Sequence, residues 1–256
     1  MNCWTRKVIG SLAAVTLFSS LLAAQPASMN RYDSTIQQQL VHKLAAKKDF
    51  RNVRAKVDNG MVTLTGTVEL YREKLDAAKQ ARKIAHAAGV RNLITVAVPA
   101  ISDDELQAKL NQKLWNDRTG YDNLFNYFTL GVHHGVVTIA GETYNDVGRE
   151  SALAIVQGTP GVKDVIENIT VSPVSPFDDD VRLRAARAIY RDPVLSRYGV
   201  DPSLPIRIIV DNGKIGLYGT VAAEMDKQIA GMRASQVFGA FRVENHLMVG
   251  KSNKAS

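Results

Sequence analysis

The sequence predicts an α+β protein made of three tandem copies of one small αββαβ module, each a three-stranded mixed sheet with two helices on one face. The first observation is a pair of glycines six residues apart that recurs at Gly60 and Gly66, Gly135 and Gly141, and Gly213 and Gly219. The second is an apolar strand that begins 24 residues after the second glycine in every copy, at Val90, Val165 and Val243. The third is composition, because a chain of 256 residues with 45% hydrophobic residues can form real cores.

Each copy is expected to begin with an amphipathic helix. Apolar residues recur there at helical spacing, at Ile36, Leu40 and Leu44, at Leu106, Leu110 and Leu114, and less regularly at Val181, Ala185 and Ala188. The acidic runs Asp103-Asp104 and Asp178-Asp179-Asp180 lie at the predicted starts of the second and third helices. Helix capping explains these carboxylates better than acid–base catalysis does, because helix N-termini favour negative charge.

A β-hairpin should follow the first helix in each copy. Alternating apolar residues lead into tight turns at Asp58-Asn59-Gly60, His133-His134-Gly135 and Asp211-Asn212-Gly213. Asn-Gly in this setting predicts a type I′ turn, in which both central residues adopt positive φ. A second helix and a last strand complete each copy, and that strand should join the same sheet with both helices packed on one face.

The first 24 residues are typical of a cleavable secretory signal. Arg6 and Lys7 precede the apolar run Val8–Leu22, which ends at the small residues Ala23-Ala24. The alternative is an uncleaved anchor helix, but the run is short of the roughly 20 apolar residues that span a bilayer. The only cysteine, Cys3, precedes the run, which disfavours a lipid anchor and a disulfide framework. We therefore expect a periplasmic protein.

The repeated glycine pattern and the segment Gly161-Val162-Lys163-Asp164-Val165, followed by Ile169 and Val171, resemble the BON domain family. BON domains are small αββαβ modules of exported bacterial osmotic-stress proteins and of secretin and channel accessory regions. The resemblance places BON-like domains at 33–99, 102–173 and 177–250, after the signal peptide predicted at 1–24. It implies a non-enzymatic module that attaches to phospholipid surfaces or to other envelope proteins.

Charge is distributed unevenly between the copies. Residues 25–101 carry 13 basic and six acidic side chains, whereas residues 102–175 carry five basic and ten acidic ones. A basic cluster in the first copy is the candidate contact to anionic phospholipid, and it consists of Lys43, Lys47, Lys48, Arg51 and Arg54. The alternative is a solvated face, on which Lys47 and Lys48 complement a helix C-terminus.

Two further groups of residues distinguish the second and third copies. An insertion before the first strand of the second copy carries Tyr121, Leu124, Phe125 and Tyr127. One hypothesis makes these residues a wedge that enters a membrane or contacts a partner protein, and the alternative is that they fold back onto the core of their own module. In the third copy Arg184, Arg187 and Arg191 form a basic stripe at helical spacing, for which pairing with residues such as Asp180 is the simpler role.

The sequence lacks the motifs of common catalytic sites. There is no Gly-x-Ser-x-Gly, no P-loop and no His-Glu-x-x-His, and the adjacent His133-His134 has no third ligand nearby. A net charge of +7 over 28.0 kDa is too dilute for a dedicated nucleic-acid-binding protein. We expect no enzyme activity, cofactor or metal. The predicted function is binding to anionic phospholipid in the cell envelope, and the alternative is a soluble periplasmic stress or chaperone-like protein that acts through protein–protein contacts.

Overall fold

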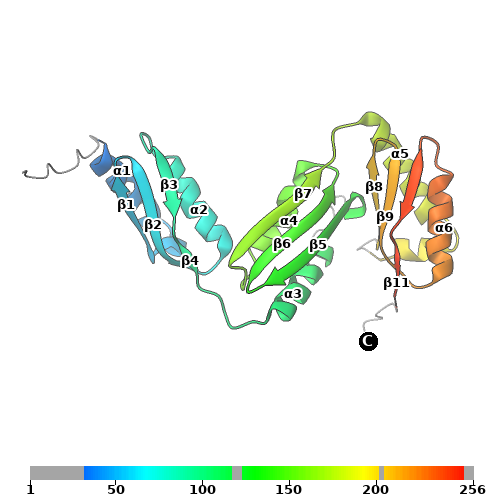
Figure 1. Cartoon of the computed structure of the whole chain (residues 1–256), viewed down its shortest axis with the longest axis horizontal. Helices are drawn as coiled ribbons and strands as arrows, with labels where there is room; N and C mark the ends of the chain where they lie inside the picture. The colour runs from blue at the N-terminus through cyan, green and yellow to red at the C-terminus, as the bar shows by residue number, and fades with distance from the viewer. Residues whose placement is uncertain (1–31, 117–122, 202–204, 251–256) are drawn as a thin grey trace, which may run out of the picture.

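The computed structural model describes residues 32–116, 123–201 and 205–250 and shows three α+β modules in succession along the chain (Figure 1). Module 1 contains α1 (Asp33–Ala45), η1 (Lys48–Phe50), β1 (Val53–Asp58), β2 (Met61–Val68), α2 (Tyr71–Arg82), β3 (Gly89–Asn92) and β4 (Thr95–Val96). Module 2 contains α3 (Asp103–Asn116), η2 (Asn123–Phe125), β5 (Asn126–His133), β6 (Val136–Thr143), α4 (Asp146–Gln157) and β7 (Asp164–Val171). Module 3 contains α5 (Pro176–Tyr190), η3 (Leu195–Gly199), β8 (Ile206–Asp211), β9 (Lys214–Val221), α6 (Glu224–Ser235), β10 (Arg242–Asn245) and β11 (Met248–Val249). The predicted fold class is confirmed.

All three sheets have the same layout. The middle strand, β2, β6 or β9, pairs antiparallel with the strand before it and parallel with the strand or strand pieces after it. The two helices of each module cover one side of its sheet (Figure 1). Buried side chains such as Val62 and Leu64 point toward these helices. The opposite side is here called the open face. It carries the strand residues that lie between the buried ones, because successive side chains point to opposite faces of a sheet.

The hairpin turns have the predicted type I′ character. The two central residues have positive φ in every module: 49° and 76° at Asn59 and Gly60, 52° and 78° at His134 and Gly135, and 49° and 73° at Asn212 and Gly213. The second glycine of the repeat is required by close packing. At Gly66 φ is +114°, and an added Cβ would lie 1.9 Å from the carbonyl oxygen of Asn52. Gly141 and Gly219 meet a backbone oxygen in the same way, which explains the repeated spacing.

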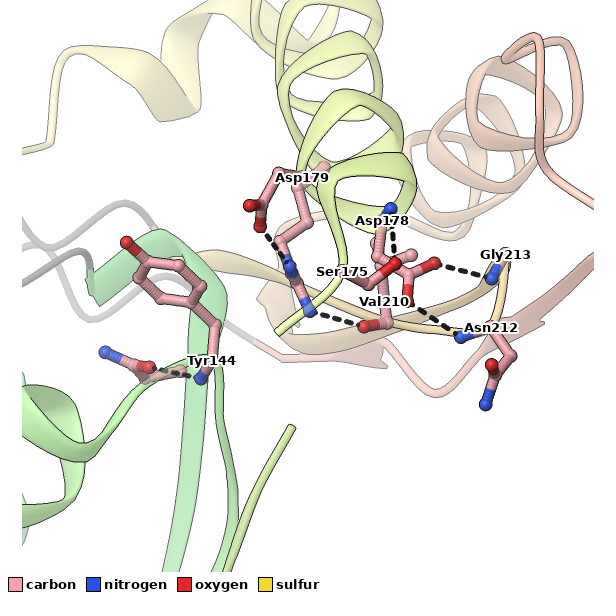
Figure 2. Close-up of polar contacts among 9 residues, drawn as sticks. Tyr144, Ser175, Asp178, Asp179, Val210, Asn212 and Gly213 are labelled. Atoms are coloured by element: carbon pink, nitrogen blue, oxygen red, sulfur yellow. Dashed lines mark hydrogen bonds and ion pairs between the residues drawn. The ribbon is translucent and has the colours of Figure 1, made fainter. Parts of the chain in front are cut away.

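An aspartate at the start of each first helix holds the hairpin turn of its own module. The carboxylate of Asp178 accepts hydrogen bonds from the backbone N–H of Asn212 at 3.1 Å and of Gly213 at 2.8 Å (Figure 2). Asp33 and Asp103 bind the corresponding turns at 2.6 to 2.9 Å. Capping falls instead to Ser102 and Ser175, whose hydroxyls accept N–H groups of the first helical turn. These aspartates therefore join helix to hairpin, a role that differs from the predicted capping.

The last strand is continuous in module 2 and interrupted in modules 1 and 3. At the interruption the side chain of Asn92 donates to the carbonyl of Lys74 in α2 at 2.8 Å, and Asn245 donates to Lys227 in α6 at 2.7 Å. Each asparagine also accepts the N–H of the residue two positions later. The corresponding residue of module 2, Glu167, forms an ion pair with Arg149 in α4. The last strand is therefore joined to the second helix by an asparagine hydrogen bond in modules 1 and 3 and by an ion pair in module 2.

Candidate binding surfaces

The five cations predicted to contact lipid are all exposed, but they do not share one face. Lys43 lies in the last turn of α1, Lys47, Lys48 and Arg51 surround η1, and Arg54 lies on the open face of the module 1 sheet. Within the described residues none of the five forms an ion pair. The structure thus divides the predicted cluster into three places.

The cations around η1 have acidic neighbours. Lys48 and Arg51 line a shallow depression together with Asp49, Glu69 and Glu73. The ammonium of Lys47 lies 5.5 Å from the centre of the Phe50 ring. Because three carboxylates border this depression against two cations, the lining carries no net positive charge.

Arg54 belongs instead to a basic open face in module 1. Arg54 pairs with Thr65 across β1 and β2, Lys56 pairs with Thr63, and Thr63 pairs in turn with Arg91 of β3. Since neighbouring strands lie about 4.8 Å apart, Lys56 and Arg91 stand roughly 10 Å apart on either side of Thr63. Threonines 67 and 95 extend the face toward its other end. All three cations are exposed, and none forms an ion pair within the described part of the chain.

Arg91 was missing from the residues predicted from sequence. It lies 37 residues after Arg54, and only the parallel pairing of β2 with β3 brings the two onto one face. The local signal was present, because Arg91 stands between Val90 and Asn92, both of which turn toward the helices. Asp58, at the turn end of β1, is the acidic residue of this face.

Three of the four residues predicted to form a wedge, Leu124, Phe125 and Tyr127, pack between modules 2 and 3. Leu124 and Phe125 lie against the core of module 3, and Tyr127 stacks on Tyr218 of β9 with ring centres 4.4 Å apart. Tyr121 lies outside the described residues. The alternative, packing onto the core of their own module, is also not what the structure shows for Leu124 and Phe125. These side chains join two modules and are not exposed for a membrane.

Two buried arginines complete this junction. Arg207 of β8 lies with its guanidinium 4.4 Å from the centre of the Trp115 ring of α3. Arg182 of α5 donates to the carbonyl of Val210 at 2.7 Å and to Asp179 at 2.6 Å, and it lies 5.3 Å from the ring centre of Tyr144. Each arginine is 3% exposed. Modules 2 and 3 are therefore held by aromatic and cation–π packing.

Modules 1 and 2 meet at Tyr71, the first residue of α2. Tyr71 is buried with the core residues of module 2, and its hydroxyl donates to the carboxylate of Asp164. Burial, followed by the hydrogen bond to Asp164 and its negative charge, raises the pKa of Tyr71 to about 12. Arg72 lies close to Gly158 in the same junction.

The histidine pair does not build a metal site. His133 and His134 lie with ring centres 4.2 Å apart in an edge-on arrangement at the turn. Across residues 32–116, 123–201 and 205–250 there is no group of three or more His, Cys, Asp or Glu side chains placed to hold a metal ion. Over the same ranges no helix is both long and apolar enough to cross a bilayer.

The sequence matches the BON domain at residues 32–98, 102–173 and 191–251. The chain belongs to the BON domain family. The three matches follow the three modules, although the third begins after α5, the helix that supplies Val181, Ala185 and Ile189 to the core of module 3. BON domain proteins are generally non-enzymatic binding modules, and the family is associated with phospholipid binding and with stress proteins.

Solved structures similar to this chain include two of one secretion-system protein. No curated protein sequence matches the chain. Two structures of CdsD, a structural protein of the type III secretion system of Chlamydia trachomatis, are similar to it at 12% and 13% sequence identity. The similarity covers 84% of this chain and 94% and 98% of those chains, with a TM-score of 0.23 in each case. A TM-score this low carries no conclusion about function.

Proposed function

We propose that this BON protein is a non-enzymatic envelope protein that binds anionic phospholipid surfaces through the open face of module 1. The observation that carries the proposal is the set Arg54, Lys56 and Arg91, three exposed cations that project from one face of the module 1 sheet. No carboxylate in the described residues pairs with them. Each basic residue held near an anionic membrane contributes about 1 kcal/mol to binding, so the three together support weak, salt-sensitive attachment.

The shape and chemistry of this face suit a bilayer surface. This sheet face has no covering helix, and the threonine hydroxyls on it can donate hydrogen bonds to phosphate oxygens. Arginine forks bind phosphate through two parallel N–H groups, which a lipid headgroup accepts. The depression at η1 is a weaker candidate because Asp49, Glu69 and Glu73 outnumber its two cations, Lys48 and Arg51.

Co-sedimentation with vesicles tests this proposal. The wild-type protein should bind vesicles that contain phosphatidylglycerol at low salt, and it should bind purely zwitterionic vesicles much more weakly. Attachment should weaken as the Debye length falls from about 10 Å at 0.1 M salt to about 3 Å at 1 M. A wild-type protein that ignores anionic vesicles even at low salt would refute lipid binding and leave the protein-contact alternative.

Two matched variants locate the contact within module 1. Replacing Arg54, Lys56 and Arg91 by Ser should lower vesicle affinity at least tenfold, because it removes the cations of the open face. Replacing Lys47, Lys48 and Arg51 by Ser removes the same charge and should lower affinity less. The reverse order would place the contact at η1.

The cell compartment belongs to the same proposal. We infer export to the periplasm from residues 1–24, which lie outside the described part of the structure. The intact mass of the exported protein should correspond to a chain that begins at Gln25. A species that retains Met1 in the membrane fraction would show that the segment is an anchor.

A further inference from the structure

Module 3 carries a group of exposed phenylalanines at the hairpin end of its sheet, here called the phenylalanine patch. It consists of Phe177 at the start of α5 and Phe238 and Phe241 in the turn between α6 and β10. Phe238 is 82% exposed, Phe241 78% and Phe177 44%. The rings of Phe177 and Phe241 stack with centres 5.9 Å apart, and the guanidinium of Arg184 lies 5.4 Å from the centre of the Phe238 ring. Large exposed aromatic groups of this kind indicate a contact surface.

The other two modules show that the fold does not require these rings. The same turn recurs with the same backbone bond to the hairpin: Phe241 donates its N–H to Gly213 at 2.9 Å, Ala88 to Gly60 at 2.8 Å and Lys163 to Gly135 at 2.9 Å. Phe238 and Phe241 therefore correspond to Ala85 and Ala88 in module 1 and to Pro160 and Lys163 in module 2. The turns of modules 1 and 2 make the same backbone bond without a phenylalanine, and module 1 instead carries His86, whose ring stacks on Tyr32 with centres 4.0 Å apart.

A groove rich in arginine adjoins the patch between α5 and α6. Arg184, Arg187, Arg191 and Arg233 line it, together with Asp192 and Phe238. Arg233 pairs with Asp192 at 2.7 Å and Arg184 with Asp180 at 3.1 Å. Arg187 and Arg191 are exposed and form no ion pair with the described residues. Four guanidinium groups against two carboxylates leave the groove positively charged.

We propose that the phenylalanine patch enters the interfacial layer of an anionic bilayer while the arginine groove beside it binds phospholipid phosphate groups. Aromatic residues flanked by arginines are typical of segments that lie in this layer, and guanidinium forks bind phosphate oxygens in pairs. Charge complementarity favours an anionic bilayer over a neutral protein surface. The inference rests on the proposed function and adds to module 1 a second contact that is partly resistant to salt.

Fluorescence quenching by lipids brominated in their acyl chains tests insertion directly. The variant Phe238→Trp should be quenched on anionic brominated vesicles, because the indole replaces a ring that enters the interface. The matched control is Ala85→Trp, at the same turn position in module 1, which should stay unquenched. Quenching of both variants to the same extent, or of neither, would overturn the proposal. Wild-type protein supplies the background from its native tryptophans.

Vesicle binding at high salt gives a second, independent test. At about 0.5 M salt the electrostatic contact of module 1 is largely screened, so the remaining affinity should depend on the phenylalanine patch. Phe238→Ala with Phe241→Ala, the residues that module 1 has at these positions, should lower it about tenfold. Met225→Ala with Met248→Ala removes two exposed apolar side chains elsewhere on module 3 and should leave it unchanged.

The outcomes separate this inference from the proposed function. If the wild type fails to bind anionic vesicles at low salt, both the proposed function and this inference are wrong. If the wild type binds but the double phenylalanine variant binds equally well at high salt, only the inference is wrong. If that variant loses self-association or protein binding and keeps vesicle binding, the patch is a protein contact, which also contradicts the inference.

Discussion

The open faces of modules 1 and 3 are built from equivalent strands in the same register, yet their surroundings are opposite. Val53 pairs with Gly66 as Ile206 pairs with Gly219, so Arg54 and Lys56 correspond to Arg207 and Ile209. The first two side chains are exposed, whereas Arg207 is 3% and Ile209 5% exposed. The difference arises because Leu124 and Phe125 of module 2 pack against module 3. The same arginine position is thus a free surface charge in one module and part of a junction in another.

Removing the module 2 side chains that cover module 3 should have the largest effect on the free energy of unfolding. Leu124→Ala with Phe125→Ala removes two side chains from the junction and should lower the free energy of unfolding by about 3 kcal/mol. Arg54→Ser with Lys56→Ser, on the corresponding face of module 1, should change it by less than about 0.5 kcal/mol. Urea unfolding followed by circular dichroism measures both variants. Equal losses would contradict the contrast between the two faces.

The aspartates that hold the hairpin turns should matter more where they are buried. Asp178 is 4% exposed, and Asp178→Ala leaves two turn N–H groups without their acceptor, which should cost about 2 kcal/mol. Asp103→Ala should cost less, because water can reach the His134 amide. Hydrogen exchange at the Gly213 and Gly135 amides compares the two turns. Each exchange rate is compared with that of the wild type. A larger increase at Gly135 in Asp103→Ala than at Gly213 in Asp178→Ala would reverse this ranking.

The junction between modules 1 and 2 depends on one phenol. Tyr71→Phe keeps the ring and removes the hydroxyl that donates to Asp164, so it should lower the free energy of unfolding by about 1 kcal/mol. Because burial raises the pKa of Tyr71 to about 12, the wild-type phenol should still be neutral at pH 11. Ultraviolet absorbance at 295 nm, compared between wild type and variant, follows its ionisation. A phenol that ionises near pH 10 would show that the junction is open in solution.

The smallest effect concerns pH at the turn of module 2. Hydrogen bonds from His134 and Gly135 hold the pKa of Asp103 below its usual value. A lowered carboxylate pKa stabilises the folded state above the unfolded value of about 3.9, and that stabilisation is lost as pH falls through the folded pKa. The Gly135 amide resonance in NMR should therefore move upfield with an apparent midpoint below about 3.9. A midpoint above that value would contradict the hydrogen-bonded turn.

The comparison also shows which parts of the structure could be derived from the sequence. The glycine spacing predicted the three modules, and Asn-Gly between runs of alternating apolar residues predicted the hairpins and their turn type, because these features follow from local backbone geometry. The position of Arg91 beside Lys56 depends on a parallel pairing between distant segments. The burial of Arg207 depends on Trp115 in helix α3 of another module. Alternation around Arg91 indicates which face of the sheet it occupies, but the local sequence does not identify the partner in either contact.

The central claim is that the open face of module 1, rather than its charge as a whole, binds anionic membranes. The most direct test compares two variants that remove three cations each: Arg54, Lys56 and Arg91 on the open face, or Lys79, Arg82 and Lys83, which are exposed on and just after α2. Titration with phosphatidylglycerol vesicles at low salt gives both affinities. The open-face variant should lose affinity at least tenfold, and the helix variant should lose much less. Equal losses would contradict the central claim and reduce the interaction to net charge.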